Sequence, residues 1–360
     1  AITRVTLKRM APTLIPLPPL AEQHRIVAKV DELMALCDEL EAAQAKREKR
    51  RDRLVVVTLH GLNNGEENGG SGNHATFEEN SRFYFSHLPR LITRPEHIRQ
   101  LRQTILNLAV RGKLVEQNPS DEPASELLKH IQTEKNFLLQ GRKGNREVAY
   151  FAIPDAEAPF HLPISWSWCR LIDLLTKLTD GTHHSPPNFA KGDFKYITAK
   201  NIKSEGVSLD EITYVSKEVH DEIFARCDPA MGDVLYIKDG ATTGIVTVNN
   251  LDEQFSMLSS VALLKLPKSI YNRLLVYFLR SPFFYSQMRG FMKGAAITRV
   301  TLKRMAPTLI PLPPLAEQHR IVAKVDELMA LCDELETKIT NTIATRRQLL
   351  EASLQEALSA

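Results

Sequence analysis

Two stretches of the chain place hydrophobic residues at alternating intervals of four and three, the pattern of a helix with a single apolar seam. Both stretches are long enough for a rod of several turns, so we predict helices over residues 21–60 and 317–360. The two seams consist of Ile26, Val30, Leu33, Cys37, Leu40, Ile321, Val325, Leu328, Cys332, Leu335 and Ile339. Their length favours an antiparallel coiled coil between these helices over two separate amphipathic helices on globular cores.

Both predicted helices form the second half of a repeat, because residues 1–41 and 296–336 are identical. The first half of each copy is apolar and β-branched, and it carries four prolines, which exclude an interior helix. We therefore predict an edge strand or an extended arm over residues 1–20 and again over residues 296–315.

Residues 61–94 are expected to form a flexible linker, since their first part, GLNNGEENGGSGNH, is rich in glycine and asparagine. Two helices are predicted after this linker, over residues 95–116 and 123–140. Gly112 is expected to stop the first of them and Pro123 to start the second. Together they form a helical connector over residues 95–162.

The pattern changes at residue 163, where short β-branched and aromatic runs begin to alternate with turn residues. Strands are predicted in FKYITAKNI, ITYVS, GDVLYIKDGATTGIVTVN and SMLSSVALLKL. The third run is interpreted as a hairpin with a tight turn at Asp239 and Gly240, and a helix, NRLLVYFLRSPFFYSQMRGFM, follows the fourth. Residues 163–316 thus form one mixed α/β domain, and the fold class of the chain is α+β, made of this domain and the long helices.

The composition is that of a globular protein, with 43% hydrophobic and 25% charged residues among 360. No apolar run approaches the roughly 18–20 residues needed to cross a bilayer, and no signal peptide is visible, so we expect a cytoplasmic protein. The four cysteines form no CxxC pair, which argues against a disulfide framework and against a zinc ribbon.

The net charge of +3 conceals an uneven distribution of charge. Residues 254–316 contain nine lysines and arginines but no acidic residue. A basic surface without compensating acid favours a polyanionic partner such as nucleic acid. A solvated basic face explains the same composition about as well, so charge alone leaves both interpretations open.

Several motifs, taken in their order along the chain, resemble the specificity subunit of type I restriction–modification systems. The segments that carry the resemblance are RQTILNLAVRGKLV with DEPASELL, LPISWSWCRLIDL, DGTHHSPPNF followed by FKYITAKNI, GDVLYIKDGATTGIVTV, and KGAAITRVTLKRMAPTLIPLPPLAEQHRIV. Each motif is weak alone, but the order is specific. Together the motifs cover most of the chain outside residues 61–94.

The resemblance implies a subunit without catalytic activity that reads one half of a bipartite site in double-stranded DNA. In this family two target recognition domains are held apart by paired helices, and methyltransferase subunits dock on the assembly. S-adenosylmethionine and ATP would be used by the methyltransferase and by the restriction subunit, so no cofactor is expected on this chain.

The start of the chain departs from the family pattern. Ala1 corresponds to Ala296 in the repeat, so residues 1–20 are expected to be the exit arm of a first recognition domain whose body is missing. This surplus arm is predicted to be disordered or to occupy the arm site of a partner chain. A homodimer of half-subunits is therefore possible.

Candidate DNA contacts gather in the loop before the first strand, at the hairpin tip and around the start of the second arm. Base readout is expected from residues 182–188 and Arg299, and phosphate contacts from Lys293, Lys303 and Arg304. The full set is Thr182, His183, His184, Ser185, Asn188, Lys200, Asn201, Lys238, Thr242, Thr243, Lys293, Thr298, Arg299, Lys303 and Arg304. For any one of them, an ordinary solvated polar side chain is the alternative.

Other interpretations of single motifs are weaker. Residues 185–188 resemble the adenine-gripping loop of amino-methyltransferases, but the fourth residue is Asn188, and no glycine-rich loop for S-adenosylmethionine follows a clear strand. His183 and His184 have no third metal ligand in register, so no metal is expected, and the PLPP at 311–314 fits a structural role better than an SH3-type ligand. Two other functions of the chain stay open, a stand-alone DNA-binding regulator and a coiled-coil scaffold.

Overall fold

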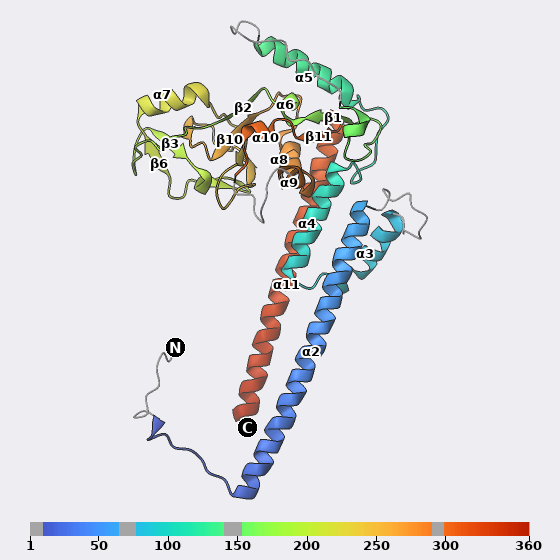
Figure 1. The fold of residues 1–360 in the computed structure, drawn as a ribbon, viewed down its shortest axis with the longest axis vertical. Coiled ribbons are helices and arrows are strands. Elements are labelled where there is room, and N and C mark those ends of the chain that lie inside the picture. The colour runs from blue at the N-terminus through green and yellow to red at the C-terminus, as the bar shows by residue number, and fades with distance from the viewer. Residues whose placement is uncertain (1–9, 65–76, 140–152, 290–298, 360) are drawn as a thin grey trace. The chain divides into compact units, whose positions relative to one another are not determined.

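The computed structural model describes residues 10–64, 77–139, 153–289 and 299–359 (Figure 1). The chain divides into two compact units, residues 1–57 and 58–360. The mixed α+β class predicted from the sequence is confirmed, because long helices accompany one region of short strands.

The first unit consists of the first copy of the repeat and most of α2 (Leu20–Asn64), whose last residues, from Thr58 on, belong to the second unit. Residues 13–19 lie ahead of α2 without helix or strand. The helix begins directly after Pro18 and Pro19, as the residue preferences of helix N-termini predict. Its seam is open to solvent: Ile26, Val30 and Leu33 are 48–50% exposed.

Among the described residues of the second unit, three complete helices follow the end of α2 and precede the β-rich part. They are α3 (Phe77–Leu91), α4 (Pro95–Val110) and α5 (Ala124–Leu139). The prediction of a linker up to residue 94 is wrong, since α3 lies within it and buries Tyr84 and Leu91. The glycine-rich stretch directly before α3 obscured the helical spacing of these apolar residues.

The helix α4 starts at Pro95, as predicted, but ends earlier than expected. Gly112 has φ +69, and its amide donates to the carbonyl of Ala109, which terminates the helix. A Cβ atom on Gly112 would lie 2.5 Å from the ring of Pro163, so glycine also allows the chain at Pro163 to approach the end of α4.

Two small sheets form the centre of the domain. The larger has the order β2-β10-β7-β8 and is antiparallel throughout, and the smaller has the order β6-β3-β9, with β3 and β9 parallel. The strands are β2 (Lys177–Asp180), β3 (Phe194–Ile197), β6 (Thr213–Val215), β7 (Val234–Ile237), β8 (Val246–Val248), β9 (Phe255–Met257) and β10 (Val261–Lys265). Ile197, Leu235, Phe255 and Leu263 lie fully buried in one core.

Smaller elements complete the domain. They are β1 (Ser167–Arg170), α6 (Leu171–Leu174), the two-stranded β4 (Ile202–Lys203) and β5 (Gly206–Val207), α7 (Lys217–Arg226), and the short 3-10 turns Asp155–Glu157 and Ala199–Asn201. Lys135 of α5 is buried and donates to the carbonyl of Ile172 at 2.8 Å, which attaches α5 to this part of the fold. Burial lowers the pKa of Lys135.

The predicted hairpin is present, since β7 pairs with β8, but its turn is not tight. The connection runs over residues 238–245 and contains Gly240 and Gly244 at φ +105 and +102. Both residues adopt a left-handed backbone that favours glycine. The loop is therefore longer than the Asp-Gly signal suggested.

The single helix predicted over residues 272–292 is instead two helices, α8 (Asn272–Arg280) and α9 (Pro282–Arg289). Ser281 separates them: its Oγ donates to the carbonyl of Phe278 at 2.6 Å and accepts from the amide of Phe284 at 3.2 Å. Pro282 then occupies the first turn of α9, where its missing N–H costs nothing.

The second copy of the repeat is built into the domain. It contributes α10 (Leu302–Met305), β11 (Leu309–Leu312) and α11 (Leu315–Ser359). The predicted strand is β11, which pairs antiparallel with β1, whereas the turn of helix α10 was not predicted. The helix α11 packs along α4, and Figure 1 shows the two side by side.

The seam of α11 is buried where it faces α4 and becomes partly exposed farther along. Ile321 and Val325 are fully buried, while Leu328, Leu335 and Ile339 are partly exposed. Arg102 of α4 pairs with Asp333 at 2.5 Å and with Glu336 at 2.7 Å. Helix α2 belongs mostly to the other unit, so the predicted coiled coil between α2 and α11 stays a prediction.

Within the described residues, no helix combines the length and the apolarity that a membrane span requires.

The identical repeats allow a matched test of packing. Ile321→Ala should lower the free energy of unfolding by about 2–5 kcal/mol, because Ile321 is 0% exposed in its site on the domain. Ile26→Ala, the same change at the corresponding position of the first copy, should alter it by less than about 0.5 kcal/mol, because Ile26 is 48% exposed. Urea denaturation of both variants, at a protein concentration where the chain is monomeric, measures the difference. Equal losses would contradict the different environments of the two copies.

Candidate DNA-binding surface

The loop of residues 181–189 leaves the end of β2 and crosses beside the turn between β9 and β10. Thr182 forms a parallel bridge with Leu258, in which its amide donates to Met257 and its carbonyl accepts from Ser259. The hydroxyl of Thr182 donates to the carbonyl of His184 at 3.1 Å and accepts from the amide of the same residue at 3.3 Å. The loop is therefore held at its base and shaped by its own hydrogen bonds.

Beyond this base, the predicted base-reading side chains are open to solvent. His183, His184, Ser185 and Asn188 are exposed, and Thr182 is half-buried. Asn188 donates to the carbonyl of Pro186 at 3.0 Å, which turns its amide back onto the loop. The exposed imidazole of His184 and the exposed hydroxyl of Ser185 can contact an external partner, whereas the imidazole of His183 lies 3.5 Å from Asp180.

Gly181 is required at the start of this loop by close backbone packing. A Cβ atom there would lie 1.8 Å from the carbonyl oxygen of Met257, which no side-chain movement can relieve. Only glycine lets the loop lie this close to the end of β9.

The loop of residues 238–245 is the second exposed segment. Thr242 is exposed at its tip, and the hydroxyl of Thr243 donates to the carbonyl of Gly240 at 2.7 Å. The amide of Lys238 donates to the carbonyl of Ser260 at 2.8 Å. This loop and the 181–189 loop therefore flank the same turn, one bonded to Ser259 and the other to Ser260.

The third segment enters at Arg299, directly after residues 290–298, which the structure does not describe. Arg299 forms an antiparallel bridge with Asp239, and the amide of Val300 donates to the carbonyl of Lys238 at 2.7 Å. The Arg299 side chain is 70% exposed and pairs with Asp239 at 3.3 Å. Lys303 and Arg304 are exposed on α10. Lys293 and Thr298 lie outside the described residues.

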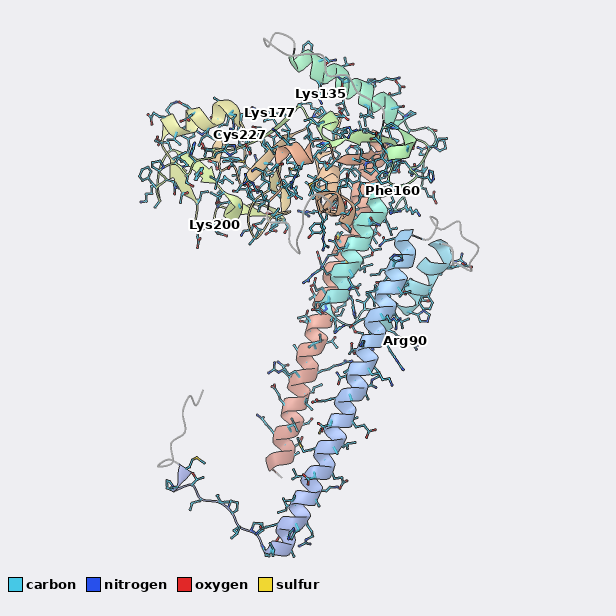
Figure 2. All side chains as sticks on the ribbon, viewed as in Figure 1. Arg90, Lys135, Phe160, Lys177, Lys200 and Cys227 are labelled. Carbon is cyan, nitrogen blue, oxygen red and sulfur yellow. The ribbon has the colours of Figure 1, made fainter. Side chains whose placement is uncertain are left out.

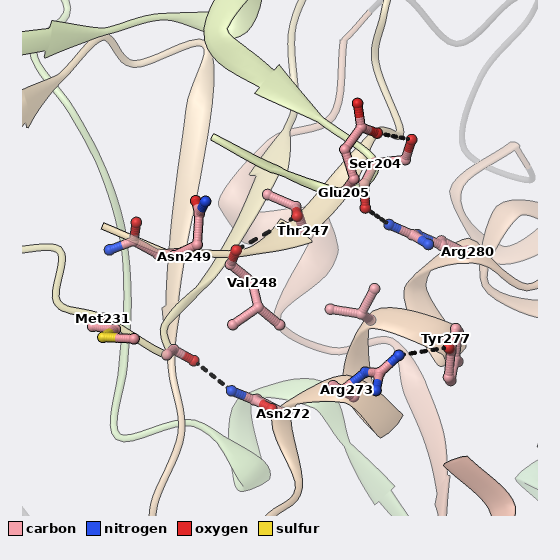
Figure 3. Close-up of a pocket in the computed structure, with 13 residues that line it drawn as sticks. Ser204, Glu205, Met231, Thr247, Val248, Asn249, Asn272, Arg273, Tyr277 and Arg280 are labelled. Atoms are coloured by element: carbon pink, nitrogen blue, oxygen red, sulfur yellow. Dashed lines mark hydrogen bonds between the residues drawn. The ribbon is translucent and has the colours of Figure 1, made fainter. Parts of the chain in front are cut away.

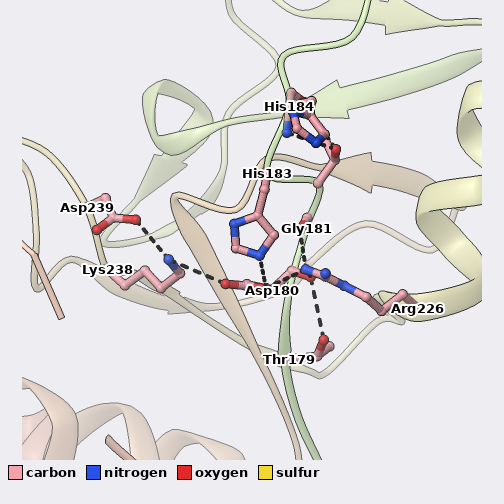
Figure 4. A network of polar contacts seen from close by, with 9 residues as sticks. Thr179, Asp180, Gly181, His183, His184, Arg226, Lys238 and Asp239 are labelled. Carbon is pink, nitrogen blue, oxygen red and sulfur yellow. Dashed lines mark hydrogen bonds and ion pairs between the residues drawn. The ribbon is translucent and has the colours of Figure 1, made fainter. Parts of the chain in front are cut away.

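Two of the side chains predicted to contact DNA are buried in the domain rather than exposed. Lys238 is 4% exposed, and its ammonium group is paired with Asp239 at 2.8 Å and Asp180 at 3.4 Å (Figure 4). Asn201 is also 4% exposed, and its amide accepts from Thr198 and donates to the carbonyls of Ser208 and Asp210. Both side chains are engaged inside the domain, because their polar groups find partners there that sequence spacing does not reveal.

The neighbouring Lys200 does face solvent. It projects outward from the edge of the domain in Figure 2. Arg226 of α7 is a further cation near the 181–189 loop, where it donates to the carbonyl of Gly181 at 2.6 Å and pairs with Asp180 at 2.5 Å. Arg226 was not predicted from the sequence, since it lies in a separate helix and no local motif marks it.

An open pocket of about 530 Å³ lies elsewhere on the domain, beside α8 (Figure 3). Its polar side chains are committed to the fold: Asn272 donates to Gly232 at 2.9 Å, Arg273 to Tyr277 at 3.3 Å, and Arg280 to Val246 at 2.8 Å. Burial raises the pKa of Tyr277 to about 12. Among the lining residues, the exposed hydroxyl of Ser204 donates to the adjacent carboxylate of Glu205 at 2.7 Å.

The described residues also contain no group of three His, Cys, Asp or Glu side chains close enough to hold a metal ion.

Comparison with known proteins places the domain in a family. The model of the type I restriction modification DNA specificity domain matches residues 163–345, which is half of the chain. The chain belongs to this family. The matched region begins where the β-rich domain was predicted to begin, and it extends into α11.

Two similar relatives are specificity subunits of type I restriction enzymes from Escherichia coli. The chain is 31% identical to the EcoAI specificity subunit over 351 residues and 28% identical to the EcoEI specificity subunit over 364 residues. In both cases the match covers 96% of this chain and 58% of the relative. The chain therefore spans somewhat more than half the length of these specificity subunits.

Among solved structures, the HsdS subunit from Thermoanaerobacter tengcongensis is similar at 18% sequence identity, with a TM-score of 0.39. That match covers 81% of this chain and 64% of the HsdS chain.

Replacement of Gly181 tests how closely the 181–189 loop packs against the end of β9. Gly181→Ala should destabilise the domain by at least about 3 kcal/mol, because the new Cβ atom meets backbone rather than a movable side chain. Gly240→Ala is the control: nothing lies within 4 Å of the place that a Cβ atom would take there, so only its left-handed backbone opposes alanine, at about 1 kcal/mol. Thermal unfolding of both variants measures the two losses. A smaller loss at Gly181 than at Gly240 would contradict the close packing.

Proposed function

We propose that this chain is the DNA-recognition subunit of a type I restriction–modification complex and reads one half of a bipartite site. The observation that carries the proposal is the proximity of three segments of the β-rich domain: residues 181–189 and 238–245 flank one turn, and residues 299–304 pair with the start of the 238–245 loop. Membership of the specificity-domain family supports the same function. The chain itself carries out no chemical step.

The exposed groups of this surface suit the two tasks of a DNA-binding protein. The imidazoles, the hydroxyls and Arg299 can donate to or accept from base edges, which is how sequence is read in the major groove. Lys200, Lys303 and Arg304 supply cations for phosphates, which fix position without carrying sequence information. Lys293 and Thr298 belong to the same proposal as neighbours of Arg299 in the sequence.

The long helices are proposed to hold the recognition domain at a fixed position and to dock methyltransferase subunits. This proposal is supported by their length: α2 and α11 have 45 residues each. S-adenosylmethionine would bind the methyltransferase subunit, and ATP would bind a restriction subunit, so this chain would hold neither cofactor. A cytoplasmic location follows from that assembly.

The decisive experiment is a genome-wide map of methylated bases in cells that express the chain with its cognate methyltransferase subunit. A new bipartite motif should appear that is absent from cells with the methyltransferase subunit alone. A symmetric motif would mean that two copies of the chain each read one half, and an asymmetric motif would mean that another chain supplies the second half. Tight site-specific binding by the chain alone, without any new motif, would favour a stand-alone regulator instead.

Two molecules of this chain can exchange arms. The two copies of the repeat have the same sequence, so either one can fit the same site on the domain. In the second copy, Glu317 accepts from Trp166 at 3.0 Å and from Gln117 at 2.7 Å, and Arg320 pairs with Asp121 at 2.5 Å. The corresponding Glu22 and Arg25 are exposed. We propose that in a homodimer of half-subunits the first repeat of one molecule occupies this site on the other molecule, in place of that molecule's own second repeat.

The first copy already has the local conformation that this exchange requires. Helix α2 starts at Leu20 and α11 at the corresponding Leu315. Gln23 donates to the carbonyl of Pro18 at 2.8 Å, and Gln318 donates to the corresponding carbonyl of Pro313 at 3.2 Å. Docking would therefore need little rearrangement of the junction between arm and helix.

Deletion of residues 1–20 tests the exchange. The deletion should convert any dimer of the chain into a monomer, because it removes Leu14, Ile15 and Leu17, which are 78–96% exposed and correspond to arm residues that the second copy packs into the domain. Light scattering after size-exclusion chromatography measures the mass. The control is Phe137→Ser, which removes another exposed apolar side chain and should leave the mass unchanged. An unaltered dimer after the deletion would exclude arm exchange.

A further inference from the structure

A chain of alternating charges runs beneath the proposed DNA-binding surface (Figure 4). Arg226 pairs with Asp180 at 2.5 Å, Asp180 with Lys238 at 3.4 Å, and Lys238 with Asp239 at 2.8 Å. Arg299 closes the chain on Asp239 at 3.3 Å, and His183 lies 3.5 Å from Asp180. The charge at the centre of this network is the ammonium group of Lys238.

The centre of the network is shielded from solvent, whereas its ends are not. The side chains of Lys238 and Asp180 are 4% and 9% exposed, while those of Arg226 and Arg299 are 51% and 70% exposed. A phosphate contact needs an accessible cation, so Lys238 lies too deep to bind DNA directly. Its two carboxylate partners provide the compensation that a buried ammonium requires.

The members of the network come from each segment that the proposed surface uses. Asp180 ends β2 and precedes the 181–189 loop, Lys238 and Asp239 open the 238–245 loop, and Arg299 begins the segment that leads to α10. The pair between Lys238 and Asp180 is a side-chain contact that joins the two loops directly. Removal of the Lys238 charge would leave two carboxylates near each other with no cation between them.

We propose that Lys238, held between Asp180 and Asp239, is a positioning residue that fixes the 181–189 loop relative to the 238–245 loop and thereby sets DNA specificity without touching DNA. The inference rests on the proposed function, since it assumes that both loops face the same half-site. Groups that read base edges must be held within about 0.5 Å of the productive geometry. A small shift of one loop against the other therefore costs more in discrimination than in overall attraction.

Two measurements separate positioning from the other roles that a lysine can have. A phosphate contact contributes about 0.9 to the slope of the logarithm of affinity against the logarithm of salt concentration, and a buried positioning lysine contributes nothing. A residue that only stabilises the fold lowers affinity for all sequences alike. A positioning residue lowers the ratio between the affinities for the correct site and for a site with one changed base pair.

The test compares Lys238→Met with Lys303→Met in the full chain, assembled with its methyltransferase subunit. The DNA is the half-site motif found by methylation mapping and versions of it with one changed base pair. Lys238→Met should reduce discrimination, normally about 5- to 150-fold per base pair, toward one, by up to about tenfold, and leave the salt slope unchanged. Lys303→Met, which removes an exposed cation, should lower the slope by about 0.9 and leave discrimination unchanged.

Asp239→Asn provides a milder second variant if Lys238→Met does not fold. The amide oxygen can still accept from Lys238, but the charge that pairs with Lys238 and Arg299 is lost, so discrimination should fall in the same direction. A reduced salt slope with full discrimination in Lys238→Met would instead make Lys238 a phosphate contact. Unchanged discrimination in a folded variant of either kind would overturn the positioning role. Absence of any motif with the unaltered chain would reject the proposed function before the variants are compared.

Discussion

The attachment of the second repeat to the β-rich domain is the constraint on which the rest of the structure depends. At its centre the carboxylate of Glu317 is 0% exposed and accepts from Trp166 and from Gln117. Burial raises the pKa of Glu317, and the two donors oppose that effect by stabilising the charged form. On one side of this point β11 closes the domain against β1, and on the other side α11 begins its course along α4. Because a strand and a helix meet at one satisfied carboxylate, the position of the helix is tied to that of the domain.

The repeat also shows that a sequence alone does not decide whether its apolar residues are buried. Ile15 and Ile310 occupy the same position of an identical sequence, yet they are 78% and 1% exposed. The difference comes from β1, Trp166 and α4, which cover the second copy and belong to segments far away in the chain. An apolar seam is buried only where another segment packs against it. The exposed first copy therefore offers an apolar surface to which another segment or another chain can bind.

Local patterns predicted much of the fold, and their failures share a physical cause. Heptad spacing located α2 and α11, and β-branched runs located β3, β7 and β10, because these signals need only neighbours in sequence. The break at Ser281 was missed because a serine and a proline lie inside an apolar run, where periodicity dominates the interpretation. Lys238 and Asn201 were assigned to the surface because polar residues are usually exposed. Their burial depends on Asp180 and on the carbonyls of Ser208 and Asp210, which only the folded chain brings to them.

The polar residues around the proposed DNA-binding surface fall into two classes, buried and exposed. Buried members such as Lys238 and Asn201 are held by several partners each, so a change in one of them disturbs the backbone of whole loops. Exposed members such as His184 and Thr242 have few ties beyond their own loop, so they can be replaced without loss of the scaffold. Specificity is then able to change through the exposed residues while the buried charges keep the loops in place. If the proposed function holds, such a domain would keep its geometry constant, and the side chains at the loop tips would determine the target.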